Sequence, residues 1–118
     1  NKNDVDDAVK TAIEMLESLE IFNKKVVKDG FKPFEIGIGI NKGKVISGNI
    51  GSNQQMNYTV IGDSVNLASR LCSTAKPGQL LISDFVQRNL LEKNKFKKIP
   101  SIKVKGKSKP IEVWSYKH

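Results

Sequence analysis

Apolar residues at the start of the chain recur every three or four positions, and this spacing predicts an amphipathic helix. The repeat follows Asp4, a residue type that caps helices, and it continues to Val26, so we expect a helix over about residues 5–28. Gly30 then ends the helix. The face expected to be buried consists of Val5, Val9, Ile13, Leu16, Leu19, Phe22 and Val26.

A hairpin is predicted after this helix. Residues 34–40 alternate large apolar side chains with small or polar ones, which is typical of a strand with one apolar face. Gly37 and Gly39 lie on the other face, where they imply that a helix or another chain packs close against the backbone. Asn41-Lys42-Gly43 supplies a turn, and a second strand over residues 44–50 returns.

The remaining segments alternate between short strands and short helices. A helix with Asp63 or Ser64 as its cap follows a β-prone run, and Ser83 or Asp84 caps another. The tail predicts a second hairpin, since two alternating runs flank a Gly- and Pro-containing turn. The predicted ranges are a strand at 58–61, a helix at 64–75, an apolar run at 80–82, a helix through residues 85–91, and strands at 102–105 and 111–114.

Composition limits what this arrangement can be. The 118 residues suffice for one domain, and a hydrophobic fraction of 38% with 27% charged residues is typical of a soluble globular protein. No apolar run approaches the roughly 20 residues that cross a bilayer, and the start does not resemble a signal peptide. Cys72 is the only cysteine, so no internal disulfide can form, which suits a reducing cytoplasm.

Positive charge is concentrated in the tail. The net charge is +8, yet the first twenty residues carry six acids and two lysines. Between Lys93 and His118 there are nine lysines and one acid, Glu112. This density would attract a polyanion such as a nucleotide, a nucleic acid or an anionic lipid. The alternative is a solvated lysine face that keeps the domain soluble.

The helix at 64–75 carries the candidate chemistry. Asn66 and Arg70 lie within about 40° of each other on a helical wheel and should form one exposed polar ridge. An amide and a guanidinium on a rigid helix can orient a sugar and neutralise charge on a phosphoryl group. An Asn and an Arg four residues apart are also ordinary surface residues. The apolar residues Leu67, Ala68, Leu71 and Ala75 cover the opposite side.

A resemblance to a known family favours the functional interpretation. Nearly all of the chain beyond the first helix resembles the class III adenylate and guanylate cyclase catalytic domain, and the match in the central stretch is long and ungapped. The segments that carry it are residues 38–43, 45–51, 58–71, 77–79, 81–83 and 104–107.

The resemblance implies roles for five residues. Asn66 matches the asparagine that orients the ribose, and Arg70 matches the arginine that stabilises the pentavalent transition state at the α-phosphorus. Lys105 matches a lysine that contacts the terminal phosphates. Thr59, with its neighbour Val60, falls where the family binds the purine, and threonine there usually accompanies ATP and is typical of a bicarbonate-responsive subgroup. A threonine hydroxyl both donates and accepts, so GTP stays an alternative.

The resemblance also implies a reaction and an incomplete fold. Family members convert a nucleoside triphosphate to the 3′,5′-cyclic monophosphate and pyrophosphate with two Mg²⁺ or Mn²⁺ ions, and for this protein the resemblance implies ATP and cyclic AMP. The two aspartates that bind these ions lie on earlier strands, and neither is found here. Asp4, Asp6 and Asp7 are interpreted as helix-capping acids instead. We therefore expect residues 1–118 to be the C-terminal part of one catalytic domain: an incomplete, ferredoxin-like α+β palm, with an antiparallel-rich sheet and helices on one side.

Family active sites form between two head-to-tail subunits, so the resemblance implies a homodimer for the longer protein and no turnover by this chain alone. It also implies a cytoplasmic catalytic domain, with any membrane contact through upstream segments. One alternative is an inactive cyclase-like module that binds nucleotide or a partner domain. A second is a nucleic-acid-binding domain, but the tail aromatics Phe96, Trp114 and Tyr116 belong to no recognisable DNA or RNA module, so no nucleic-acid partner is expected.

Overall fold

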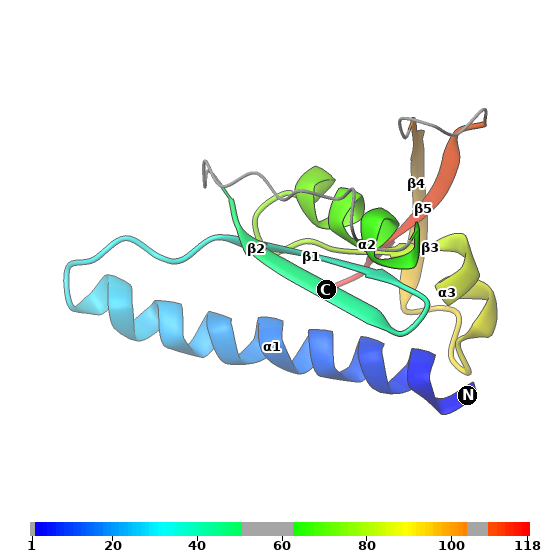
Figure 1. Ribbon diagram of the computed structural model, residues 1–118. Helices are drawn as coiled ribbons and strands as arrows, with labels where there is room; N and C mark the ends of the chain where they lie inside the picture. Colours follow the sequence, from blue (N-terminus) through cyan, green and yellow to red (C-terminus); the bar gives the residue numbers. More distant parts are fainter. Residues whose placement is uncertain (1, 51–62, 104–108) are drawn as a thin grey trace.

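A five-stranded mixed sheet with helices on both faces forms the domain (Figure 1). The computed structural model describes residues 2–50, 63–103 and 109–118. No helix among these residues is both long and apolar enough to cross a membrane. The elements are α1 (Lys2–Lys28), β1 (Ile36–Asn41), β2 (Lys44–Asn49), α2 (Asp63–Thr74), β3 (Leu80–Ser83), α3 (Asp84–Asn89), β4 (Phe96–Ile102) and β5 (Ile111–Tyr116).

The strand order is β2-β1-β3-β5-β4. β1 and β2 form the predicted hairpin, with Asn41 opposite Lys44, and β1 runs parallel to β3. β5 is antiparallel to both β3 and β4, so three of the four strand pairings are antiparallel. This mixed sheet confirms the α+β class and its antiparallel-rich character. It also leaves β2 and β4 as the edge strands.

The first core lies between α1 and one face of the sheet. The first half of α1 buries its apolar stripe as predicted, and Ile38 and Ile40 of β1 point toward it. In the second half, Leu19 and Val26 are only half-buried. The prediction is wrong for Phe22, which is 50% exposed and stacks on Phe34 with ring centroids 5.8 Å apart. Figure 1 shows the reason, since α1 continues past the strands and finds no sheet to cover there.

The second core lies on the other face, so the expectation of helices on one side is wrong. Leu71 of α2 and Ala75, the residue that follows this helix, pack with Leu81 of β3 and Val113 of β5. Successive residues of a strand point to opposite faces, so β1 presents its isoleucines to α1 and its glycines to α2. β3 is buried on both faces, as its unbroken apolar run requires.

Two strands begin at residues other than those predicted. β1 begins at Ile36, two residues later than expected. The first strand of the tail hairpin was expected at 102–105, yet β4 ends at Ile102 and begins at Phe96. Pro100 lies within this strand, and β4 accommodates it because it is an edge strand with a register irregularity between Ile99 and Ile102.

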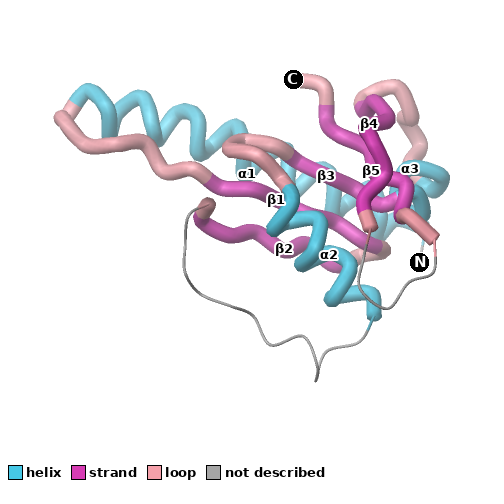
Figure 2. The backbone as a smooth tube through the Cα atoms, turned by 90° about the horizontal axis from the view of Figure 1, so that it is seen from above, coloured by secondary structure: helices cyan, strands magenta, loops and turns pink. Residues whose placement is uncertain are grey.

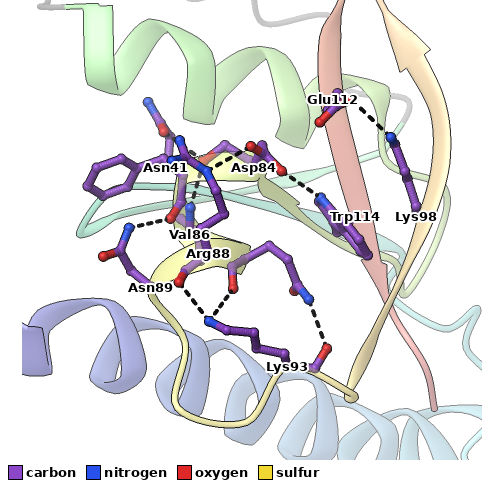
Figure 3. A network of polar contacts seen from close by, with 12 residues as sticks. Asn41, Asp84, Val86, Arg88, Asn89, Lys93, Lys98, Glu112 and Trp114 are labelled. Carbon is purple, nitrogen blue, oxygen red and sulfur yellow. Dashed lines mark hydrogen bonds and ion pairs between the residues drawn. The ribbon is translucent and has the colours of Figure 1, made fainter.

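A polar network holds α3 at the ends of β1 and β3 (Figure 3). The Ser83 hydroxyl accepts from the Val86 amide at 3.3 Å, so Ser83 rather than Asp84 is the N-cap. The same hydroxyl donates to Asn41 Oδ1 at 2.8 Å. Asp84 instead accepts from the Trp114 indole at 3.2 Å. The sequence around Asn41 predicts only a turn, because the hydrogen-bond partner of Asn41 lies 42 positions away.

Replacement of the Ser83 hydroxyl should therefore lower stability. We expect Ser83→Ala to reduce the free energy of unfolding by about 1–2 kcal/mol, because α3 loses its cap and a buried hydrogen bond to Asn41 is lost. The shift of the urea unfolding midpoint measures this change. Ser101→Ala, at an exposed position of β4, is the matched control and should change stability by less than about 0.5 kcal/mol. Equal effects of the two substitutions would contradict the assignment.

Candidate active site

α2 carries the two candidate catalytic residues that lie in the described part of the chain. It lies across β1, β2 and β3 on the face opposite α1 (Figure 2). As predicted, the apolar side of α2 faces the sheet, with Ala68, Leu71 and Ala75 buried and Leu67 packed against the same core. The opposite side of the helix is therefore left for polar residues, which fixes the direction in which Asn66 and Arg70 are presented.

Arg70 is exposed on the outer side of α2. Its guanidinium makes no ion pair or hydrogen bond to any residue in the described ranges. Its backbone carbonyl accepts a hydrogen bond from the Thr74 hydroxyl at 2.8 Å, within the same helix. The donors of the side chain are thus free of partners within the described chain and can bind an anionic group.

Asn66 lies one helical turn before Arg70 and is half-buried, so the predicted ridge is not evenly exposed. Its Oδ1 atom is buried and has no hydrogen-bond partner among the described residues, and the same holds for the buried hydroxyl of Ser69. A buried polar atom without a partner carries a desolvation cost, and a ligand donor could remove that cost.

The other predicted site residues cannot be placed. Thr59 and Val60 belong to residues 51–62, and Lys105 belongs to residues 104–108; both segments lie outside the described residues. The structure therefore places Asn66 and Arg70 one turn apart on α2, whereas the predicted purine and terminal-phosphate contacts involve residues outside the described ranges. The predicted strand at 58–61 is outside the described residues as well.

Several tail lysines have partners within the protein. The Lys93 ammonium donates to the carbonyl oxygens of Arg88 at 2.6 Å and Leu90 at 2.9 Å, so it caps the C-terminal end of α3. Lys98 pairs with Glu112 at 2.9 Å across the β4–β5 hairpin. These lysines contribute to local structure, and the tail is not a uniform row of free positive charge.

Metal-ligating side chains do not gather in groups of three or more within the described ranges. Burial raises the pKa of the Cys72 thiol above its usual value. This thiol lies on the sheet-facing side of α2 and donates to the Gly37 carbonyl oxygen at 3.3 Å. It therefore belongs to the contact between α2 and β1 and not to the outer ridge.

A large groove lies on the α1 face of the domain. It has a volume of about 800 Å³ and lies between the second half of α1, Phe34, Pro77 and the end of β5 at Tyr116. Neither Asn66 nor Arg70 lines it. The groove is therefore separate from the candidate site on α2.

Comparisons with known proteins agree with this fold. Residues 1–116 match the family model described as adenylate and guanylate cyclase catalytic domain. An adenylate cyclase of Anabaena cylindrica is 36% identical over 121 aligned residues, which cover 95% of this chain and 24% of that protein. Two solved structures are similar: the adenylyl cyclase CyaB from P. aeruginosa (TM-score 0.75, 30% identity) and the guanylyl cyclase Cya2 (TM-score 0.70, 28% identity).

The alignments also show how much of each relative the chain represents. The structural matches cover 99% of this chain and 60% of the CyaB chain, and 98% of this chain and 59% of the Cya2 chain. The chain thus spans about 60% of the solved chains and a quarter of the Anabaena cyclase. One structural relative is an adenylyl cyclase and the other a guanylyl cyclase, so the likeness leaves the choice of base open.

Proposed function

Because the chain belongs to the adenylate and guanylate cyclase catalytic domain family, we propose that it supplies the Asn66 and Arg70 part of an adenylate cyclase active site. The observation that carries this proposal is the pair of unused polar groups on α2. The guanidinium of Arg70 is exposed without a partner in the described chain, and the Oδ1 of Asn66 one turn away is buried without one. Within the described residues, neither the Arg70 guanidinium nor the Asn66 Oδ1 atom takes part in a hydrogen bond of the fold.

The reaction is an intramolecular phosphoryl transfer. The ribose 3′-oxygen of ATP forms a bond to the α-phosphorus, the bond from that phosphorus to the pyrophosphate oxygen breaks, and the proton of the hydroxyl passes to water. Asn66 orients the ribose so that the 3′-oxygen lies in line with the leaving group. Arg70 donates hydrogen bonds to the phosphoryl oxygens as charge develops on them.

Two divalent cations, Mg²⁺ or Mn²⁺, supply activation of the hydroxyl and neutralisation of the phosphates when they are bound. In this proposal their ligands are aspartates outside residues 1–118, and this chain is the C-terminal part of the catalytic domain. The coverage of about 60% of the solved cyclase chains supports that division. A head-to-tail homodimer in the cytoplasm then brings Asn66 and Arg70 of one subunit to the cations of the other.

The base preference in this proposal comes from Thr59, which favours ATP over GTP. Val60 completes the contact to the purine, and Lys105 binds the terminal phosphates. These three assignments rest on the match to the family's motif. The side-chain hydroxyl of a threonine can both donate and accept, so discrimination between the two purines through it should be modest.

An assay of cyclic nucleotide formation tests the proposal. The longer protein that contains this chain should convert ATP to 3′,5′-cyclic AMP with Mg²⁺ or Mn²⁺ and should use GTP less efficiently. Residues 1–118 alone should give no product, because they lack half of the site. Turnover by residues 1–118 would contradict the divided site, and exclusive use of GTP would contradict the base assignment. Binding of ATP by the longer protein without product would indicate a non-catalytic module.

A further inference from the structure

The face of β1 that meets α2 carries glycines at the two positions where the strand comes closest to the helix. Gly37 and Gly39 occupy this face, while Ile38 and Ile40 point to the opposite core. A methyl group on Gly39 would overlap the Ala68 carbonyl oxygen and the Cys72 amide nitrogen. Both of these are backbone atoms of α2, so the helix rests directly on the backbone of the strand.

Gly37 makes a second contact of the same kind nearer the C-terminal end of α2. A methyl group there would lie 2.9 Å from the Ala75 Cβ and 3.0 Å from the Cys72 carbonyl oxygen. Gly37 and Gly39 do not have positive φ angles, whereas Gly30 and Gly78 do. The requirement for glycine at positions 37 and 39 is therefore one of space and not of backbone conformation.

The Gly39 contact lies between the two proposed active-site residues along the helix. Ala68, whose carbonyl oxygen meets Gly39, comes two residues after Asn66 and two residues before Arg70. Backbone atoms cannot change rotamer, so an added methyl group must move the helix as a whole. Any such movement would carry both polar side chains with it.

We infer that Gly37 and Gly39 are positioning residues for the cyclase reaction, because they set the height of α2 above the sheet and hence the position of Asn66 and Arg70. This inference rests on the proposed function of α2. The glycines act through the helix and touch no substrate. A displacement of about 1 Å at a catalytic group costs about 100-fold in rate, which is the size of effect that a methyl group at Gly39 should cause.

Alanine substitutions in the longer protein test this inference. Gly39→Ala should lower kcat by about 100-fold and change KM by less than about threefold, because transition-state contacts are more sensitive to helix position than ground-state binding. Gly37→Ala should show the same kcat effect to a smaller degree, since its contacts are 2.9 Å and 3.0 Å. Adding Ala75→Gly to Gly37→Ala removes the closest contact and leaves the one to the Cys72 carbonyl oxygen, so it should restore part of the lost kcat.

Gly48→Ala is the matched control. Gly48 lies opposite Gly37 in the β1–β2 register and faces the same helix, but a methyl group there would lie 3.5 Å from the Cys72 sulfur, an ordinary contact distance. This variant should keep the kcat of the unmodified protein. The four variants thus place the same methyl group on one face of the sheet. It is crowded in Gly39→Ala and Gly37→Ala, less crowded when Ala75→Gly is added, and at an ordinary contact distance in Gly48→Ala.

Thiol labelling of residues 1–118 gives a readout that does not depend on activity. Cys72 is the only cysteine, is half-buried, and donates to the Gly37 carbonyl oxygen at 3.3 Å. Burial raises the pKa of this thiol, so little reactive thiolate forms at pH 8 and labelling of the folded chain should be slow. A raised helix exposes the sulfur, so Gly39→Ala should speed labelling about tenfold, and Gly48→Ala should not.

The outcomes separate this inference from the proposed function. If the unmodified longer protein forms no cyclic nucleotide, the proposed function fails, and the labelling rates still report whether the glycines set the helix height. If cyclase activity is present but Gly39→Ala keeps the kcat and labelling rate of Gly48→Ala, the glycine inference is wrong. If Gly39→Ala does not fold, Gly37→Ala with and without Ala75→Gly tests the inference. The inference would be overturned if kcat in the double variant does not recover.

Discussion

Arg70→Ala in the longer protein is expected to lower kcat for cyclic AMP formation by about 10²–10³-fold. The reason is that the substitution removes donors that stabilise charge on the α-phosphoryl group in the transition state. KM should change much less than kcat, because the additional charge that develops in the transition state is absent from the ground state. Stability should also change little, since the Arg70 side chain is exposed and makes no ion pair within the described residues. Initial rates at several ATP concentrations measure kcat and KM, and a urea unfolding curve measures the stability.

Two further variants show whether the guanidinium itself matters. Arg70→Lys keeps the charge but loses the planar fork of donors, so it should recover only a small part of the lost rate. Arg88→Ala is the matched control on α3, where the arginine is exposed and pairs with Asp84 at 2.9 Å, and it should leave kcat unchanged. Similar losses in Arg70→Ala and Arg88→Ala would show that the effect is general and would contradict the role of Arg70.

The same variant tests the head-to-tail arrangement. Arg70→Ala subunits mixed with subunits that lack an upstream metal-binding aspartate should form heterodimers with one complete site. If equal amounts of the two subunits pair at random, half of the dimers are mixed. Each mixed dimer has one complete site out of two, so about a quarter of the original activity should return. No recovery, despite demonstrated subunit exchange, would contradict a site shared between subunits.

Leu81→Ala is expected to lower the free energy of unfolding by about 2–5 kcal/mol, the largest stability effect among the substitutions considered. Leu81 lies on a strand that is buried on both faces, is 0% exposed, and packs with Leu71 of α2 and Val113 of β5. Its truncation leaves a cavity beneath the helix that carries the candidate site. Because small domains have total stabilities of about 5–15 kcal/mol, this loss should be visible as a large fall in the urea midpoint.

Leu91→Ala makes the same chemical change at a position that is 85% exposed. It should alter stability by no more than about 0.5 kcal/mol, because little apolar surface leaves or enters water. A large loss from Leu91→Ala, or a small one from Leu81→Ala, would show that the core between α2 and the sheet is not where the structure places it.

Local sequence patterns determined most of the elements. The three-and-four spacing from Val5 to Leu16 is confirmed as the buried stripe of α1, and the alternation of isoleucine and glycine is confirmed in β1. The residues on the sheet-facing side of α2 are likewise those that its helical spacing indicates. These predictions succeed because the side-chain periods of helices and strands depend only on local backbone geometry.

The failures share one physical cause, which is that burial depends on what lies across from an element. Nothing in the spacing of α1 shows that the sheet ends before Phe22, so its exposure was not predicted. Likewise, a strand pattern shows that two faces differ but not which helix covers each, and α2 proved to lie opposite α1. Pro100 could be placed in a strand only once β4 was known to be an edge.

The candidate site divides in the same way. The sequence by itself determined that Asn66 and Arg70 lie one turn apart on a helix, and its resemblance to the cyclase family predicts the chemistry of these two residues. Only the tertiary structure decided that Asn66 is half-buried, that Arg70 has no partner within the described chain, and that Gly39 rather than a side chain supports the helix between them. Exposure and close approach are properties of two packed surfaces, and a sequence pattern describes only one of them at a time.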